Sequence, residues 1–195
     1  MADRKRRAPV VLRELRWEDF TARAETYLAL WDEVRENPDL GMTLGETRPT
    51  EDEEIDWFAG LYRRVRKGQT IVVIGEVDGR AVGMVSIAPG PLGGPRSENA
   101  HVGILGVLVD RRYRGRGIGE AMLVRALELA RERFEIVRLI VFSVNVRAKR
   151  LYERLGFRTN GRLEREVKRG GRYLDEEMMS LDLKAWRPPT SRTGQ

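Results

Sequence analysis

One stretch of this sequence constrains the fold more than any other, residues 107–121, VLVDRRYRGRGIGEA. It begins with apolar residues typical of a strand, passes through a turn rich in arginine and glycine, and runs into an apolar helical pattern. The start of a helix offers unpaired backbone N–H groups and the positive end of the helix dipole. Gly115, Gly117 and Gly119 have no Cβ, so the main chain can approach an anion closely. The stretch therefore predicts a phosphate-binding turn.

The spacing of this turn excludes two common nucleotide-binding motifs. The Walker pattern G-x-x-x-x-G-K-[ST] is absent. In the dinucleotide pattern G-x-G-x-x-G, Gly115 and Gly117 match the first two glycines, but Glu120 stands where the third is required. That motif also belongs to the first β-α-β unit, whereas this turn lies past the middle of the chain.

Composition limits the remaining classes of protein. The chain has 195 residues, no cysteine and one histidine, His101, so we expect no disulfide, no thiolate nucleophile and no metal site. Lys and Arg (36) outnumber Asp and Glu (30), and the modest net charge of +6 makes nucleic acid the less favoured partner. Without a long apolar run or a secretory h-region, we expect a cytoplasmic protein with no membrane partner. We expect one domain at 9–186, a basic disordered tail at 1–8 and a C-terminal tail at 187–195.

Periodicity predicts alternating strands and helices. Apolar or alternating runs predict strands at 10–15, 70–77, 80–87, 102–109, 136–142, 157–168 and 172–183. Helical spacing predicts helices at 19–35, 51–65, 119–133 and 146–155, the first with an inner side of Phe20, Ala24, Tyr27, Leu28 and Trp31. The strand–helix–strand order at 102–142 predicts a right-handed crossover between parallel strands.

Short local signals mark where these elements begin and end. Asp19, Thr50 and Asn145 are expected helix N-caps, with Glu53 completing a capping box. Gly156 fits a C-terminal stop, and the pair Asp78-Gly79 favours a type I′ hairpin turn. The segment 89–99, PGPLGGPRSEN, is expected to be a flexible connection.

Two motifs together resemble a known family. Arg114, Gly117 and Gly119 form R-x-x-G-x-G, and residues 145–157 match N-x-x-A-x-x-L-Y-x-x-L-G-F. Both resemble the GNAT superfamily of N-acetyltransferases, and the later G-R-Y-x-D-E-x-x-M stretch resembles its branch of ribosomal-protein and small-amine acetyltransferases. The resemblance implies an α/β (α+β) GNAT fold, in which about four helices flank a mixed central sheet of six to seven strands. It also implies that parallel strands splay apart at the cofactor site.

The resemblance also implies a site for acetyl-CoA. Main-chain groups of Val107, Leu108 and Val109 would bond the pantetheine arm, one of them polarising the thioester carbonyl. Asn145 would bond the same arm, and Tyr152 would protonate the departing thiolate as general acid. Tyr152 also lies on an apolar stripe, so core packing is the alternative interpretation. The diphosphate would be bound by the turn and helix start, namely Arg114, Gly115, Arg116, Gly117, Ile118, Gly119 and Glu120.

The general base is not supplied by the resemblance. Many relatives have a glutamate at one of two strand positions that are Gly103 and Ile140 here. Histidine is the side-chain type whose unperturbed pKa lies nearest neutrality, so His101 is a candidate base, although a surface or strand-edge histidine is the simpler interpretation. The other candidates are Glu46, Glu98, Asp175 and a chain of water molecules.

These observations favour an acetyl-CoA-dependent N-acetyltransferase that transfers the acetyl group directly in a ternary complex, since no cysteine could form an acyl intermediate. The acceptor is a primary amine, either a protein N-terminus, a lysine or a small amine. The alternatives are an inactive coenzyme A-binding module and a ribosome- or nucleic-acid-associated protein. The sequence leaves open whether the protein forms a homodimer.

Overall fold

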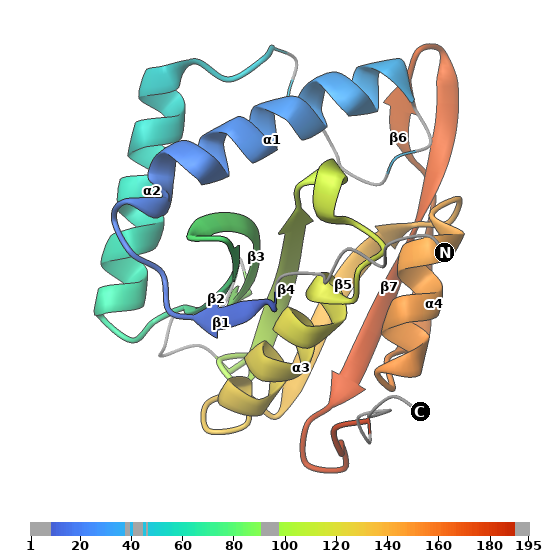
Figure 1. The fold of residues 1–195 in the computed structure, drawn as a ribbon. Coiled ribbons are helices and arrows are strands. Elements are labelled where there is room, and N and C mark those ends of the chain that lie inside the picture. The colour runs from blue at the N-terminus through green and yellow to red at the C-terminus, as the bar shows by residue number, and fades with distance from the viewer. Residues whose placement is uncertain (1–8, 38–39, 41–44, 46, 91–97, 190–195) are drawn as a thin grey trace, which may run out of the picture.

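The computed structural model describes residues 9–37, 40, 45, 47–90 and 98–189, and it contains one mixed sheet with helices on both faces (Figure 1). The expected tail at 1–8, Glu46 and most of the 89–99 connection lie outside the described residues. The strands are β1 (Val11–Arg13), β2 (Ile71–Val77), β3 (Arg80–Pro89), β4 (Val102–Val109), β5 (Ile136–Phe142), β6 (Arg158–Arg169) and β7 (Arg172–Asp182). The helices are α1 (Asp19–Glu36), α2 (Glu51–Arg66), α3 (Ile118–Ala130) and α4 (Val146–Arg154), with a 3-10 turn, η1, at Arg111–Tyr113.

The strand order β1-β2-β3-β4-β5-β7-β6 contains one parallel pair, β4 with β5. These two strands pair only from Val102 with Ile136 to Ile104 with Arg138. Beyond that point β4 stays paired with β3 and β5 stays paired with β7. The two parallel strands therefore diverge, as expected, and the sheet contains a gap between them.

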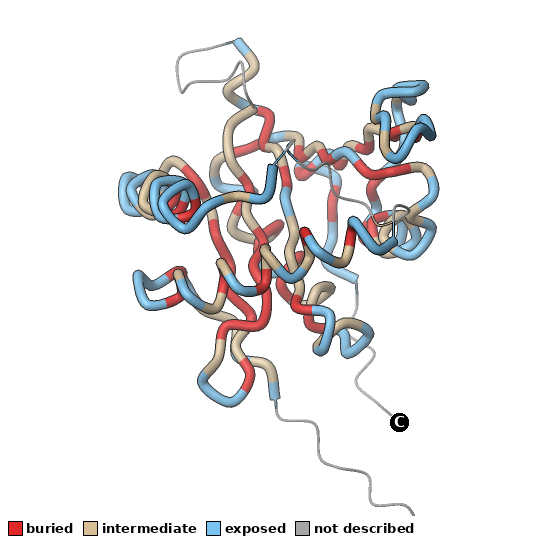
Figure 2. The backbone as a smooth tube through the Cα atoms, turned by 90° about the horizontal axis from the view of Figure 1, so that it is seen from above, coloured by how far each residue is buried: buried red, intermediate tan, exposed pale blue. Residues whose placement is uncertain are grey.

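The two faces of the sheet are covered differently. The main core lies under α3 and α4, where Met122, Leu123 and Leu127 of α3 pack on the inner sides of β2, β3 and β4. A smaller cluster under α1 and α2, including Phe58 and Leu61, covers the β2 and β3 side of the opposite face. Figure 2 shows the buried residues gathered along the strands and on the inner sides of the helices.

Helix α1 does not bury the side that its apolar spacing predicts. Of the expected inner residues only Trp31 is buried, whereas Asp19, Arg23 and Thr26 are also buried. Asp19 is not the N-cap, because that position is Glu18. The Asp19 carboxylate instead accepts both Nη groups of Arg13, at 2.7 and 2.8 Å, and the amide of Arg16. The helix orientation is thus determined by ion pairs that hydrophobic periodicity does not detect.

The other local signals are confirmed. Thr50 and Glu53 form the capping box, and Asn145 caps α4 by accepting the amide of Ala148 at 3.1 Å. Asp78 and Gly79 both have positive φ, as a type I′ turn requires. Gly156, at φ 96°, is the left-handed residue that ends α4.

Two element boundaries differ from those expected. The first strand is limited to Val11–Arg13, the only residues of that run that pair with β2. Helix α3 ends at Ala130 rather than near Arg133, because the chain turns there to enter β5 and the amide of Phe134 bonds back to Ala130. Among the described residues, no helix is long and apolar enough to cross a membrane.

The packing around β4 generates a prediction about two of its glycines. A Cβ on Gly103 would lie 2.6 Å from Cγ2 of Ile87 and 3.0 Å from the Phe134 ring, whereas a Cβ on Gly106 would meet only the Ser86 hydroxyl at 3.3 Å. We expect Gly103→Ala to lower the free energy of unfolding by about 1–3 kcal/mol through overpacking. Gly106→Ala is the matched control and should change it by less than about 1 kcal/mol. Urea unfolding measures both, and equal effects would contradict the packing described.

An ion pair between α4 and β7 generates a second prediction. Lys149 donates to Glu177 at 2.6 Å and holds the pKa of that carboxyl below its ordinary value. A lowered folded-state pKa stabilises the fold at pH values above the unfolded-state pKa, and this contribution disappears as the pH falls through the folded-state pKa. We expect Glu177→Gln to lower the melting temperature at pH 7, with the difference from wild type shrinking below about pH 4. A difference independent of pH would contradict the pair's role.

Candidate active site

The gap between β4 and β5 exposes one edge of β4. The amide of Asp110 donates to Val82 on β3, and hydrogen bonds alternate along an antiparallel ladder. The main-chain groups of Val107 and Val109 therefore point away from β3, toward the gap, whereas those of Leu108 point to β3. The Leu108 carbonyl lies 2.9 Å from the position of a Cβ on Gly83 of β3, in agreement with this direction. Of the three expected pantetheine contacts, only Val107 and Val109 thus present main-chain groups to the gap.

The start of α3 supplies a second set of unpaired backbone groups. Gly117 is the N-cap, and the helical hydrogen bonds begin with the amide of Ala121, which donates to Gly117. The amides of Ile118, Gly119 and Glu120 precede this bond and have no partner within the helix. No side chain of the N-cap residue covers them.

Positive φ angles at Gly115 (76°) and Gly117 (83°) allow the turn to expose these amides. A residue with a Cβ is strained at such angles, so glycine is required for the conformation as well as for access. The turn is joined to β4 through η1, where Asp110 accepts the amide and guanidinium of Arg112. Residues 115–120 therefore form a turn whose unpaired amides suit an anionic ligand, here called the cradle, and phosphate binding by it stays a prediction.

The arginine and glutamate side chains of this turn mostly face other parts of the protein. Arg114 donates from Nε to the Val109 carbonyl at 3.0 Å and from Nη1 to Glu33 of α1 at 2.8 Å. Arg116 donates to the carbonyl of Arg112. The Glu120 carboxylate lies 3.3 Å from Arg154, so only its amide faces the helix start. Arg114 therefore fixes the turn against β4 and α1, and its guanidinium is less available to a phosphate than the sequence motif suggests.

A further arginine approaches the cradle from a different helix. Nη2 of Arg147, in the first turn of α4, lies 3.1 Å from the position that a Cβ on Gly115 would occupy. Sequence reasoning missed this residue, because it occupies a variable position of the N-x-x-A motif. Its position in the sequence could have identified it, because Asn145 begins α4 next to the site and Arg147 is the second residue of that helix.

Asn145 and Tyr152 occupy α4 beside the gap. The Asn145 side-chain oxygen caps the helix, which leaves its amide nitrogen for another contact. Tyr152 is 7% exposed and packs edge-on against Phe157, in the same cluster as Ile118 of α3. Burial raises the pKa of Tyr152 to about 12, so its hydroxyl remains protonated at neutral pH. None of the described residues hydrogen-bonds this hydroxyl, so it is available as a proton donor.

The structure separates two of the candidate bases, His101 and Glu98, from the gap. His101 and Glu98 lie in the turn before β4, with the His101 ring 3.2 Å from the Glu98 carbonyl. Val107 is six residues further on, about 20 Å along the strand. Asp175 accepts the amide of Arg165 and the guanidinium of Arg162, which hold the pKa of its carboxyl below its ordinary value. Glu46 lies outside the described residues.

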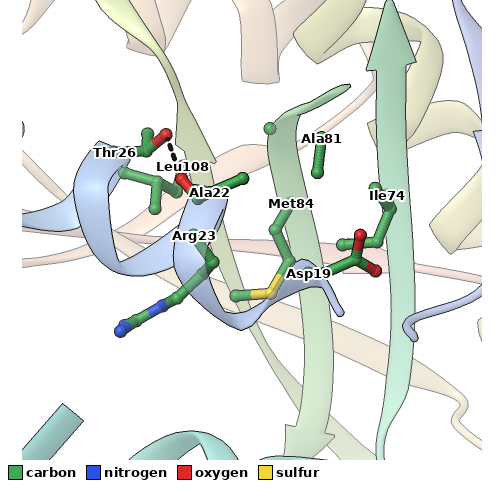
Figure 3. Close-up of a pocket in the computed structure, with 9 residues that line it drawn as sticks. Asp19, Ala22, Arg23, Thr26, Ile74, Ala81, Met84 and Leu108 are labelled. Carbon is green, nitrogen blue, oxygen red and sulfur yellow. Dashed lines mark hydrogen bonds between the residues drawn. The ribbon is translucent and has the colours of Figure 1, made fainter. Parts of the chain in front are cut away.

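Figure 3 shows a pocket between α1 and the sheet, on the face opposite α3. Leu108 of β4 lines it together with Met84 and residues of α1, among them Thr26. The Arg23 side chain extends away from the pocket in this view, and it pairs with Glu54 and stacks on Trp57 at 3.8 Å. Arg23 therefore joins α1 to α2. Among the described residues, no three His, Asp or Glu side chains form a group that could bind a metal ion.

A family model described as the acetyltransferase (GNAT) family matches residues 12–157, three quarters of the chain. The chain belongs to the GNAT acetyltransferase family. The match includes the β4 edge, the 115–120 cradle and α4. In the described part of the chain, seven strands in a mixed sheet and four helices form the fold expected for this family.

Individual relatives match this chain with limited sequence identity. The L-amino acid N-acetyltransferase AaaT of Escherichia coli is 29% identical over 53% of this chain and 63% of its own length. A spermine/spermidine N(1)-acetyltransferase of Bacillus subtilis is 36% identical over 35% of this chain and 46% of its own. The chain thus spans less than two thirds of either relative. A phosphinothricin acetyltransferase from Sinorhizobium meliloti, solved in complex with AcCoA, superposes with a TM-score of 0.76, 20% identity and coverage of 93% and 94%.

The position of Arg147 predicts a contribution to anion binding. We expect Arg147→Ala to weaken coenzyme A binding about tenfold, because a charge-assisted contact to the diphosphate is lost. Arg125→Ala, on the exposed side of α3, removes the same charge away from the cradle and is the control. Calorimetry with coenzyme A and with pantetheine, which lacks the diphosphate, measures the effect. An equal loss for both ligands would contradict a contact with the phosphates.

Proposed function

We propose that this protein is an acetyl-CoA-dependent N-acetyltransferase that transfers the acetyl group directly to a primary amine of a small molecule. The observation that carries this proposal is the presence of two sets of backbone amides that have no hydrogen-bond partner in the described part of the fold. One set lies at the start of α3 and the other along the β4 edge. The first suits a diphosphate, and the second suits an extended polar arm lying along a strand.

Acetyl-CoA would supply an acetyl thioester, whose C–S bond breaks as the amine nitrogen forms the new C–N bond. The cradle at 115–120 and Arg147 would bind the diphosphate, and Val109 and Asn145 would orient the arm. The Val107 amide would donate to the thioester carbonyl, stabilising negative charge on that oxygen. Tyr152, kept protonated by burial, would donate its proton to the departing sulfur.

No base is assigned to a residue in this proposal. Gly103 and Ile140 occupy the two positions at one of which the family resemblance implies a glutamate in many relatives, and Gly103 has no room for a longer side chain. Ile140 is 55% exposed on the side of the gap opposite α3 and α4. The amine would lose its proton to water reaching this open side.

Amino acids and polyamines are the acceptors that the relatives' names support for this chain. Protein N-termini and lysines, which the sequence resemblance also implied, have less support. Cytoplasmic localisation and the possible formation of a homodimer stay predictions from the sequence.

Thiol release from acetyl-CoA, measured with a panel of L-amino acids and with spermidine, tests the function. Release that depends on the acceptor and yields the N-acetyl product is the expected result. Coenzyme A binding without turnover on any acceptor would favour the inactive module. Absence of coenzyme A binding would refute both.

Removal of the Tyr152 hydroxyl tests the acid. We expect Tyr152→Phe to lower kcat by about 10²–10⁴-fold, because general acid catalysis contributes that much, with little change in coenzyme A affinity. Tyr113→Phe is the control, since that ring lies under Arg116 in the turn. Steady-state kinetics and calorimetry measure the two quantities. Unchanged kcat would show that Tyr152 only packs in the core.

A further inference from the structure

Arg138 occupies an unusual place in the sheet, at the last residue pair before β4 and β5 diverge. It pairs with Ile104 on one side and with Ser180 of β7 on the other. Arg138 and Ile140 are two residues apart in one strand, so their side chains lie on the same face. That face is the one opposite α3 and α4, because Val137, Leu139 and Val141 point into the main core. Arg138 therefore lies at the closed end of the gap, on its open side.

The guanidinium of Arg138 has no partner among the described residues. Its Nε is buried without a hydrogen bond, and no described carboxylate lies within 4.0 Å of it. Polar groups of β7 on this face bond to other residues: Ser180 accepts from Asn160 at 2.8 Å, and Oδ1 of Asp182 accepts the amide of Lys184 at 2.8 Å. Leaving a buried donor of a charged group unsatisfied costs free energy, and a ligand that accepts hydrogen bonds from the guanidinium would offset that cost.

The position of this guanidinium relative to the gap limits what the ligand is. The Val107 amide lies three residues beyond Ile104, about 10 Å along β4. An amine that reacts beside Val107 from the open side would lie between that amide and Arg138. In an α-amino acid the carboxylate and the amine are bonded to the same carbon, so the carboxylate extends from the reacting nitrogen toward the guanidinium.

We propose that Arg138 binds the carboxylate of the acceptor, and that the acceptor is an α-amino acid rather than a polyamine. A guanidinium matches a carboxylate with two parallel N–H···O bonds, which orient the acceptor as well as attract it. A polyamine would instead place a second positive charge near Arg138. This inference rests on the proposed function, and it names the class of acceptor for the same site.

The test compares wild type with Arg138→Met and with the control Arg158→Met. Arg158 of β6 pairs with Ser180 and lies on the same face, one strand beyond β7. The substitution Arg158→Met therefore removes the same charge at a position farther from the gap. The acceptors are L-methionine, L-methioninamide, which lacks the carboxylate, and spermidine. We expect Arg138→Met to raise KM for L-methionine about 10- to 100-fold, with kcat and coenzyme A affinity within about threefold. KM for L-methioninamide should stay nearly unchanged, and Arg158→Met should resemble wild type.

The alternative outcomes separate this inference from the proposed function. An unchanged KM for L-methionine in Arg138→Met, or equal losses for acid and amide, would overturn the role of Arg138. Transfer by wild type to spermidine but not to L-methionine would overturn the acceptor class and leave the transferase standing. If wild type releases no thiol with any acceptor, the proposed function fails. In that case, calorimetry of L-methionine binding to the coenzyme A-loaded protein tests the role of Arg138. Binding to wild type that is lost in Arg138→Met supports the inference, and absence of binding to wild type overturns it.

Discussion

The divergence of β4 from β5 after Ile104 is the constraint on which the site depends. A backbone amide inside a sheet normally bonds to a neighbouring strand, and leaving it unpaired costs free energy unless water or a ligand supplies a partner. Here the chain leaves the amides of Val107 and Val109 without a strand beside them. It also ends the strand in a turn that leaves the first amides of α3 unpaired. Both sets lie at the same end of β4, so one extended ligand could satisfy them together.

Ion pairs keep this arrangement in place where apolar packing alone would not. Arg114 connects the turn to the end of β4 and to α1, and Lys149 connects α4 to β7 through Glu177. Each pair is partly buried and joins elements that are distant in sequence. Such contacts orient the helices around the gap, and the main core under α3 supplies most of the stabilisation. Arg138 and Ile140 lie on the open side of the gap.

Most of the fold could be predicted from the sequence, because its strands and helices have strong periodicity and its turns contain residues with special backbone requirements. Thr50, Asn145 and Gly156 act locally, and the structure confirms each. The buried side of α1 could not be predicted, since Asp19 and Arg23 are polar and their partners, Arg13 and Glu54, are identified only by tertiary contacts.

The site shows the same division between local and tertiary information. The motif predicted a glycine-dependent turn at 115–120, and the positive φ angles of Gly115 and Gly117 confirm that conformation, whereas its binding of phosphate stays a prediction. It did not reveal that Leu108 faces β3, which depends on strand register, or that Arg147 reaches the cradle from another helix. His101 is a candidate base by residue type alone, yet it lies at the opposite end of β4 from the gap.

Amide hydrogen exchange with and without coenzyme A tests the central claim most directly, because it reports on individual backbone N–H groups. The account predicts that coenzyme A slows exchange at two places together, the amides of Ile118, Gly119 and Glu120 and those of Val107 and Val109. Exchange at Leu108, already bonded to β3, should change little by comparison. Protection confined to other segments, or unchanged exchange at both places, would contradict the account.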